Sequence, residues 1–172
     1  MTVRMGGSAQ VNAATRRGEQ VVRAANSQLV HDFGLLIKAA TRLEQRIDTA
    51  LRRECGISHT MLEVLIRLCR KPGEEVSQRQ LADDLTLTSS GTTRLIDRME
   101  EAGLVRRVPS PDDRRSVFVE PTDHGRTVFL QAVTVHSHVV ERYFVTPVVR
   151  DDYTRLTDAL SDINEALRDA AG

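Results

Sequence analysis

The sequence predicts a mainly helical protein with one small β-hairpin. Aliphatic residues recur at spacings of three and four along most of the 172-residue chain, as they do in amphipathic helices. A single segment, residues 104–120, has the character of two short strands joined by a proline-containing loop. With 40% hydrophobic and 28% charged residues, the composition is that of an ordinary globular protein with a sizeable core.

The N-terminal half of the chain is expected to begin with an extension, residues 1–27, that is polar, partly flexible and helical only around residues 12–25. A long helix should follow and end at Gly56. Its apolar face is formed by Leu35, Leu36, Ala39, Leu43, Ile47 and Leu51. Ser58 is placed to cap a second helix, which ends at the sequence K-P-G.

Two shorter helices come next. The first is predicted from Gln78 to Leu85, with Ser77 as its N-cap, and the second from Ser89 to Ala102, with Gly103 just after its end. The sequence T-L-T between them leaves room only for a tight turn. A short helix and a turn that lead into a second helix form a helix-turn-helix.

A stiff hairpin follows the helix-turn-helix. Its strands are predicted at residues 104–108 and 116–120. Pro109 and Pro111 restrict the backbone of the loop between them, which carries two aspartates and two arginines. A cationic hairpin in this position is the wing of a winged helix-turn-helix.

The C-terminal part should form two more helices. Thr122 is placed to cap a long helix that Pro147 ends, and residues 151–170 show another amphipathic pattern. The long helices carry more aliphatic surface than a small winged helix can cover, so a homodimer is expected. We therefore assign residues 28–56 and 122–172 to dimerisation and residues 57–121 to the winged helix-turn-helix, within one compact domain overall.

The second helix of the motif has the features of a major-groove reader. Leu95, Ile96 and Met99 can face the core, which leaves polar residues on the opposite side. Small hydroxyls and an arginine near a helix N-terminus fit close to base edges and phosphates. The residues expected to contact DNA from this helix are Ser89, Ser90, Thr93 and Arg94.

Residues 57–125 resemble the MarR family of winged-helix transcriptional regulators. The resemblance is carried by R-Q-L-A-D-D-L, by T-T-R-L-I-D-R-M-E-E-A-G-L-V-R-R, and by the wing P-S-P-D-D-R-R-S-V-F-V. The chain then has P-T-D-H-G where the family usually has L-T-x-x-G. This resemblance implies a homodimer on pseudo-palindromic double-stranded DNA, acting in most members as a repressor that a small molecule, metal or oxidant releases.

The resemblance also implies further DNA contacts. Arg114 and Arg115 of the wing are expected to reach a minor groove, with Asp113 pairing with a nearby arginine. Ser77, Gln78 and Arg79, in the first helix of the motif, are expected to contact phosphates.

An enzyme is not expected, because the sequence has no Gly-rich phosphate loop, nucleophile elbow or metal-ligand motif. The alternative function is a winged-helix protein-interaction module. No cofactor is required. His124, His136 and His138 make only a weak candidate for a metal site, because His136 and His138 are two residues apart and do not lie on the same face of a helix.

The N-terminus lacks a secretory pattern, and Cys55 and Cys69 do not make a disulfide framework. A cytoplasmic protein without membrane contact is therefore expected. Cys55 remains a candidate redox sensor.

Overall fold

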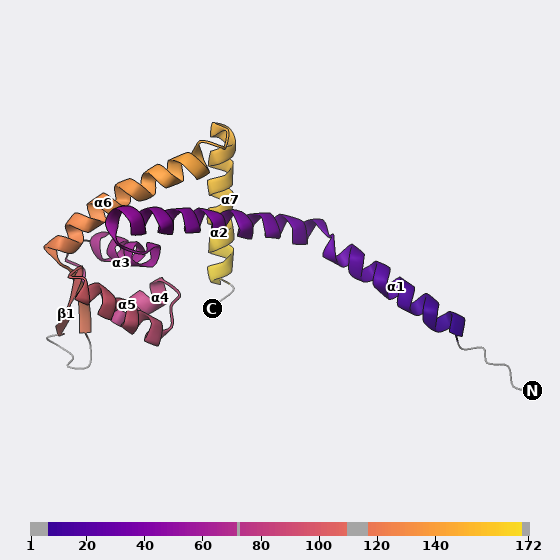
Figure 1. Cartoon of the computed structure of the whole chain (residues 1–172), viewed down its shortest axis with the longest axis horizontal. Helices are drawn as coiled ribbons and strands as arrows, with labels where there is room; N and C mark the ends of the chain where they lie inside the picture. The colour runs from indigo at the N-terminus through magenta and orange to yellow at the C-terminus, as the bar shows by residue number, and fades with distance from the viewer. Residues whose placement is uncertain (1–6, 72, 110–116, 170–172) are drawn as a thin grey trace, which may run out of the picture. The chain divides into compact units, whose positions relative to one another are not determined.

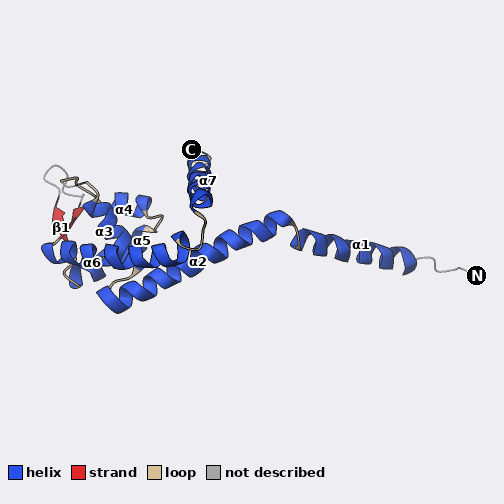
Figure 2. Ribbon diagram, turned by 90° about the horizontal axis from the view of Figure 1, so that it is seen from above, coloured by secondary structure: helices blue, strands red, loops and turns tan. Residues whose placement is uncertain are grey.

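The computed structural model describes residues 7–71, 73–109 and 117–169, and the described part is almost entirely helical apart from one hairpin (Figures 1 and 2). The elements, in chain order, are α1 (Gly7–Ala25), α2 (Gln28–Cys55), α3 (His59–Cys69), α4 (Gln78–Asp84), α5 (Ser89–Glu101), β1 (Val105–Pro109), β2 (Val117–Pro121), α6 (Asp123–Val140), the π-helical turn η1 (Glu141–Val145) and α7 (Arg150–Asp169). The mainly helical fold class with a two-stranded antiparallel wing is confirmed. No helix in these described ranges is long and apolar enough to cross a membrane.

The chain divides into two compact units, Met1–Arg42 and Leu43–Gly172. The first unit contains α1, which starts five residues before the expected position, and the beginning of α2. In the described part of this unit most of the large hydrophobic side chains are solvent-exposed. The exposed large side chains of this unit are Val21, Val22, Leu29, Val30, Phe33, Leu35, Leu36 and Ile37.

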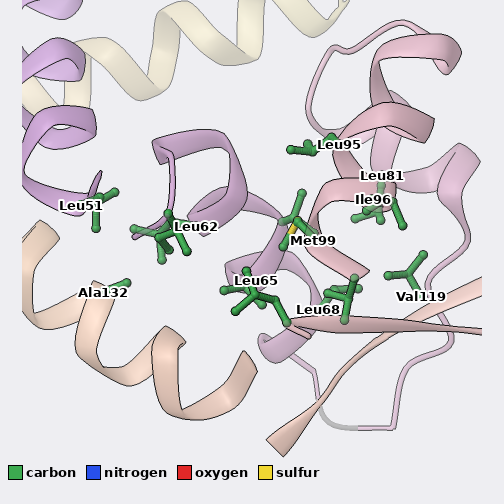
Figure 3. Close-up of a cluster of buried hydrophobic side chains, with 14 of the residues drawn as sticks. Leu51, Leu62, Leu65, Leu68, Leu81, Leu95, Ile96, Met99, Val119 and Ala132 are labelled. Atoms are coloured by element: carbon green, nitrogen blue, oxygen red, sulfur yellow. The ribbon is translucent and has the colours of Figure 1, made fainter. Parts of the chain in front are cut away.

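The second unit is built around one aliphatic core. Leu51 of α2, Leu62 and Leu65 of α3, and Ile96 and Met99 of α5 are completely buried (Figure 3). α3 packs against α6 and β2, and α4 packs against α5. The buried side chains of α2, α3, α5 and α6 include pairs spaced three or four residues apart, so their burial follows from the amphipathic pattern.

Local signals in the sequence set the helix ends. The hydroxyls of Ser58, Ser77 and Thr122 accept hydrogen bonds from backbone N–H groups in the first turns of α3, α4 and α6, as expected. Ser77 and Gln80 form a full capping box. Gly103 follows α5 with a φ of 68°, a left-handed conformation that glycine adopts without strain.

The hairpin is attached to the helix-turn-helix. β1 and β2 pair antiparallel from Val105 opposite Pro121 to Pro109 opposite Val117, each strand one residue later than expected. The N–H of Val119 donates to the carbonyl of Val76, at 2.9 Å, and this bond links β2 to the segment that enters α4. The base of the wing therefore has a fixed position relative to α4.

The valine-rich segment after β2 is helical, as its length without turn residues indicated. α6 runs to Val140 and continues as η1 to Val145, two residues before Pro147. In α7 none of the described residues is buried, and Leu156, Ile163 and Leu167 form an exposed aliphatic stripe.

Candidate nucleic-acid interface

α5 has one buried and one exposed face. Thr88 caps its N-terminus by accepting a hydrogen bond from the N–H of Gly91, at 3.1 Å. Leu95, Ile96 and Met99 are buried as predicted. Thr92 is also buried, and its hydroxyl donates to the carbonyl of Thr88 at 3.1 Å, so this polar group is satisfied within the helix.

The four residues predicted to read DNA all lie on the exposed face of α5. Ser89 and Ser90 occupy the first turn, where unpaired N–H groups attract anions. Thr93 follows one turn later, with its hydroxyl donating to the carbonyl of Ser89 at 3.0 Å. Arg94 is exposed and, within the described part of the chain, has no carboxylate in ion-pairing distance. Its guanidinium is therefore available to a ligand.

The fold brings α4 and the start of α5 together around an open groove of about 580 Å³. Gln78, Arg79, Ala82, Asp83, Leu87, Ser89 and Thr93 line it. Two of the expected phosphate contacts therefore lie beside two of the expected base contacts, which the sequence could not show. Ser77, the third residue expected to contact a phosphate, is engaged in the capping box. Its hydroxyl oxygen lies 3.2 Å from the backbone nitrogen of Gln80 and 2.9 Å from the side-chain oxygen of Gln80.

Gln78 has an unusual environment in this groove. Its side-chain nitrogen is buried and has no hydrogen-bond partner among the described residues. A buried amide without a partner costs about 1–3 kcal/mol. Asp113, Arg114 and Arg115, the wing residues predicted to contact DNA, lie outside the described residues.

An ion-pair network that the sequence did not predict joins α5 to the wing. Nη2 of Arg107, on β1, lies 2.5 Å from Oδ1 of Asp97, and Nη1 lies 2.6 Å from Oε2 of Glu100. The backbone N–H of Arg107 also donates to Oε1 of Glu100 at 3.0 Å. These hydrogen bonds, first from the backbone and then from the guanidinium, lower the pKa of the Glu100 carboxyl.

A second network fixes α4 relative to α3. Arg67 of α3 donates from Nε to Asp84 at the end of α4, at 2.5 Å. Its two terminal nitrogens bind both oxygens of Glu74, at 3.0 and 3.1 Å. Two carboxylates distant in sequence therefore hold one guanidinium, and the helix-turn-helix is connected to the core by charge-assisted bonds as well as by apolar packing.

The histidines are arranged differently from the weak metal site considered above. His136 of α6 stacks on His59 of α3, with ring centroids 5.9 Å apart and planes inclined by 19°. His124 and His138 are exposed. In residues 7–71, 73–109 and 117–169, no group of three histidine, cysteine or acidic side chains could hold a metal ion.

We expect the His136 pair to make stability dependent on pH. Burial, and then the neighbouring His59, lower the pKa of His136 from 6.5. The unfolded chain therefore binds this proton more tightly, and the free energy of unfolding should fall as the pH drops below 6.5 towards the lower folded value. Denaturant titrations across this range should show a weaker pH dependence for His136→Phe than for the wild type. The exposed His138→Phe serves as the control, and equal curves for both variants would contradict this assignment.

The cysteines are free and half-buried. Burial raises the pKa of both thiols, with Glu54 adding to the effect at Cys55. Because the thiolate is the nucleophile that attacks a peroxide, a raised thiol pKa disfavours rapid oxidation.

Comparisons with known proteins agree with this geometry. The MarR family model matches residues 57–117, from just before α3 to the start of β2. The chain is 30% identical to the HTH-type transcriptional regulator PecS of Dickeya dadantii over 137 residues, which cover 77% of this chain and 82% of PecS.

Two solved structures share the fold and more than a quarter of the sequence. Sco3205, a MarR family transcriptional regulator from Streptomyces coelicolor in complex with DNA, is 29% identical with a TM-score of 0.74, over 83% of this chain and 92% of that one. CouR from Rhodococcus jostii RHA1, bound to p-coumaroyl-CoA, is 30% identical with a TM-score of 0.67, over 80% of this chain and 95% of that one. Since the match to PecS extends beyond the winged helix into most of both chains, this chain belongs to the MarR family and is a DNA-binding, helix-turn-helix transcriptional regulator.

Proposed function

We propose that two copies of this chain bind a pseudo-palindromic double-stranded DNA site, with α5 of each copy in the major groove. The observation that carries this proposal is the exposed face of α5, where Ser89, Ser90, Thr93 and Arg94 lie together while the opposite face is buried. Two-fold symmetry of the protein would match the symmetry of such a site.

The chemistry of the groove beside α5 fits the DNA backbone. Arg79 is exposed and can pair with a phosphate, whereas the side chain of Gln78 would have to turn outwards to reach one, because its nitrogen is buried. Arg94 can donate two parallel hydrogen bonds to guanine or bind a phosphate. The wing arginines Arg114 and Arg115, oriented by Asp113, would reach the adjacent minor groove, where narrow A·T-rich sequences attract guanidinium groups.

We propose in addition that the protein is a repressor released by a small-molecule effector. The similarity to CouR, which was solved with p-coumaroyl-CoA bound, supports a ligand response. Titration of candidate ligands, zinc and peroxide against the protein–DNA complex would identify the effector and the sign of its action.

Replacing Arg94 by alanine should weaken binding to the DNA upstream of the protein's own coding sequence by about 1–3 kcal/mol if the side chain contacts a base. The thermal stability should stay nearly unchanged, because Arg94 is exposed and unpaired within the described part of the chain. Fluorescence anisotropy over a series of salt concentrations measures the affinity, and phosphate contacts give it a steep log-linear salt dependence.

Arg168→Ala is the matched control, because it removes the same charge from an exposed position on α7. Equal affinities for the wild type and Arg94→Ala would show that this face of α5 does not read DNA. Absence of any salt-dependent DNA binding by the wild type would favour the alternative, a protein-interaction module.

A further inference from the structure

We propose that Arg107 is a positioning residue for DNA binding, which cancels the charge of two carboxylates on α5 and holds them against the wing. This inference rests on the proposed function, in which α5 enters the major groove. It assigns a role to a strand residue that makes no direct contact with a base or a phosphate.

The geometry shows that Arg107 acts on α5 through several bonds at once. Its guanidinium spans Asp97 and Glu100, three residues apart on α5, with bonds of 2.5 and 2.6 Å. Its backbone N–H occupies the second oxygen of Glu100. The side chain is only 25% exposed, in contrast to 49% for Asp97 and 40% for Glu100. The arginine therefore lies beneath the two carboxylates, between the helix and the strand.

The charges on α5 explain why such an arginine is needed. The helix carries two arginines and three carboxylates, so it has a net charge of −1 and would by itself be repelled by phosphates. Asp97 is one turn from Arg94 along the helix. The cation of Arg107 brings the balance to zero and directs the Asp97 carboxylate towards the wing, which leaves Arg94 and Arg98 as the exposed cations of α5.

The neighbouring arginine provides a contrast. Arg106 is largely exposed and binds Glu120 on the paired strand, at 3.1 Å from Nε and 2.8 Å from Nη2. This pair lies entirely within the hairpin and makes no bond to α5 among the described residues. Arg106 and Arg107 thus have the same charge and adjacent positions, and they differ in whether they contact the reading helix.

The test uses the full-length protein and the DNA upstream of its own coding sequence. Arg107→Ala should lower the affinity by about tenfold or more, because two uncompensated carboxylates then face a polyanion. Arg106→Ala should change it by less than about threefold, as expected for an exposed ion pair. Thermal melts show that each variant is folded at the temperature of the binding measurement.

Removal of the carboxylates separates charge cancellation from simple loss of structure. In the triple variant Arg107→Ala, Asp97→Asn, Glu100→Gln, most of the lost affinity should return, although no ion pair can re-form. If Arg107→Ala does not fold, the test uses instead a double variant that keeps Arg107 and carries Asp97→Asn and Glu100→Gln. This double variant should bind DNA at least as tightly as the wild type.

The proposal is overturned by an unchanged affinity for Arg107→Ala, by an equal loss for Arg106→Ala, or by no recovery in the triple variant. Weakened binding by the double variant would overturn it as well. The proposed function fails separately: if Arg94→Ala weakens binding and Arg107→Ala does not, only the role of Arg107 is wrong. If neither substitution alters binding, the assignment of α5 as the reading helix is wrong.

Discussion

Replacement of Gly125 by alanine is expected to destabilise the protein by about 3 kcal/mol or more, one of the largest effects that a single methyl group can have. A Cβ atom at Gly125 would lie 1.9 Å from the carbonyl oxygen of Leu104 and 2.9 Å from its carbonyl carbon. Both are backbone atoms at the entry to β1, so neither can move aside as a flexible side chain could. Chemical denaturation followed by circular dichroism measures the loss.

Gly34→Ala is the control for this substitution. Gly34 also lies in a helix, and a Cβ atom there meets nothing within 4 Å. Alanine should therefore leave stability unchanged or raise it by up to about 1 kcal/mol, because it reduces the entropy of the unfolded chain. A Gly125→Ala protein as stable as the wild type would show that the approach of α6 to Leu104 is looser than the structure indicates.

Placing a charge on the aliphatic stripe of α7 is expected to abolish dimerisation and, with it, tight DNA binding. Ile163 lies in the middle of this stripe and is 48% exposed, between Leu156 at 37% and Leu167 at 65%. Aliphatic side chains this accessible are typical of an interface that a partner covers. Ile163→Asp should convert a dimer into a monomer at micromolar concentration, as measured by light scattering.

The same variant should lose about a hundredfold or more in DNA affinity, since the second half-site no longer benefits from the first. Ser161→Asp adds the same charge at an exposed position of α7 outside the stripe, and it should remain dimeric and bind DNA normally. A wild-type protein that is monomeric under these conditions would contradict the dimer directly. A dimeric Ile163→Asp would show that the aliphatic stripe of α7 is not the dimer interface.

The helix-turn-helix and its boundaries could be predicted from sequence because their causes are local. Ser58, Ser77 and Thr122 cap helices through bonds to residues three positions later, and Gly103 ends α5 through its own backbone conformation. Such bonds depend only on neighbouring residues. The same holds for the burial of Leu95, Ile96 and Met99, because helical periodicity alone places them on one face.

Part of the candidate site was predicted for the same reason. Ser89, Ser90, Thr93 and Arg94 are exposed because they lie opposite that buried face. The wing residues Asp113, Arg114 and Arg115 fall outside the described residues, and their roles remain predictions. The groove that unites α4 with α5 depends on how the two helices pack, which periodicity does not specify.

Other features were decided only by tertiary structure. Gly125 is required because α6 passes the Leu104 carbonyl, twenty-one residues earlier in the chain, and nothing around Gly125 in the sequence indicates this contact. Arg107 meets Asp97 and Glu100, and His136 stacks on His59, for similar reasons. In each case the interaction energy comes from a partner that folding brings close. Local sequence therefore determined which elements form and which faces they bury, whereas the packing of those faces determined which charged, aromatic and backbone groups meet.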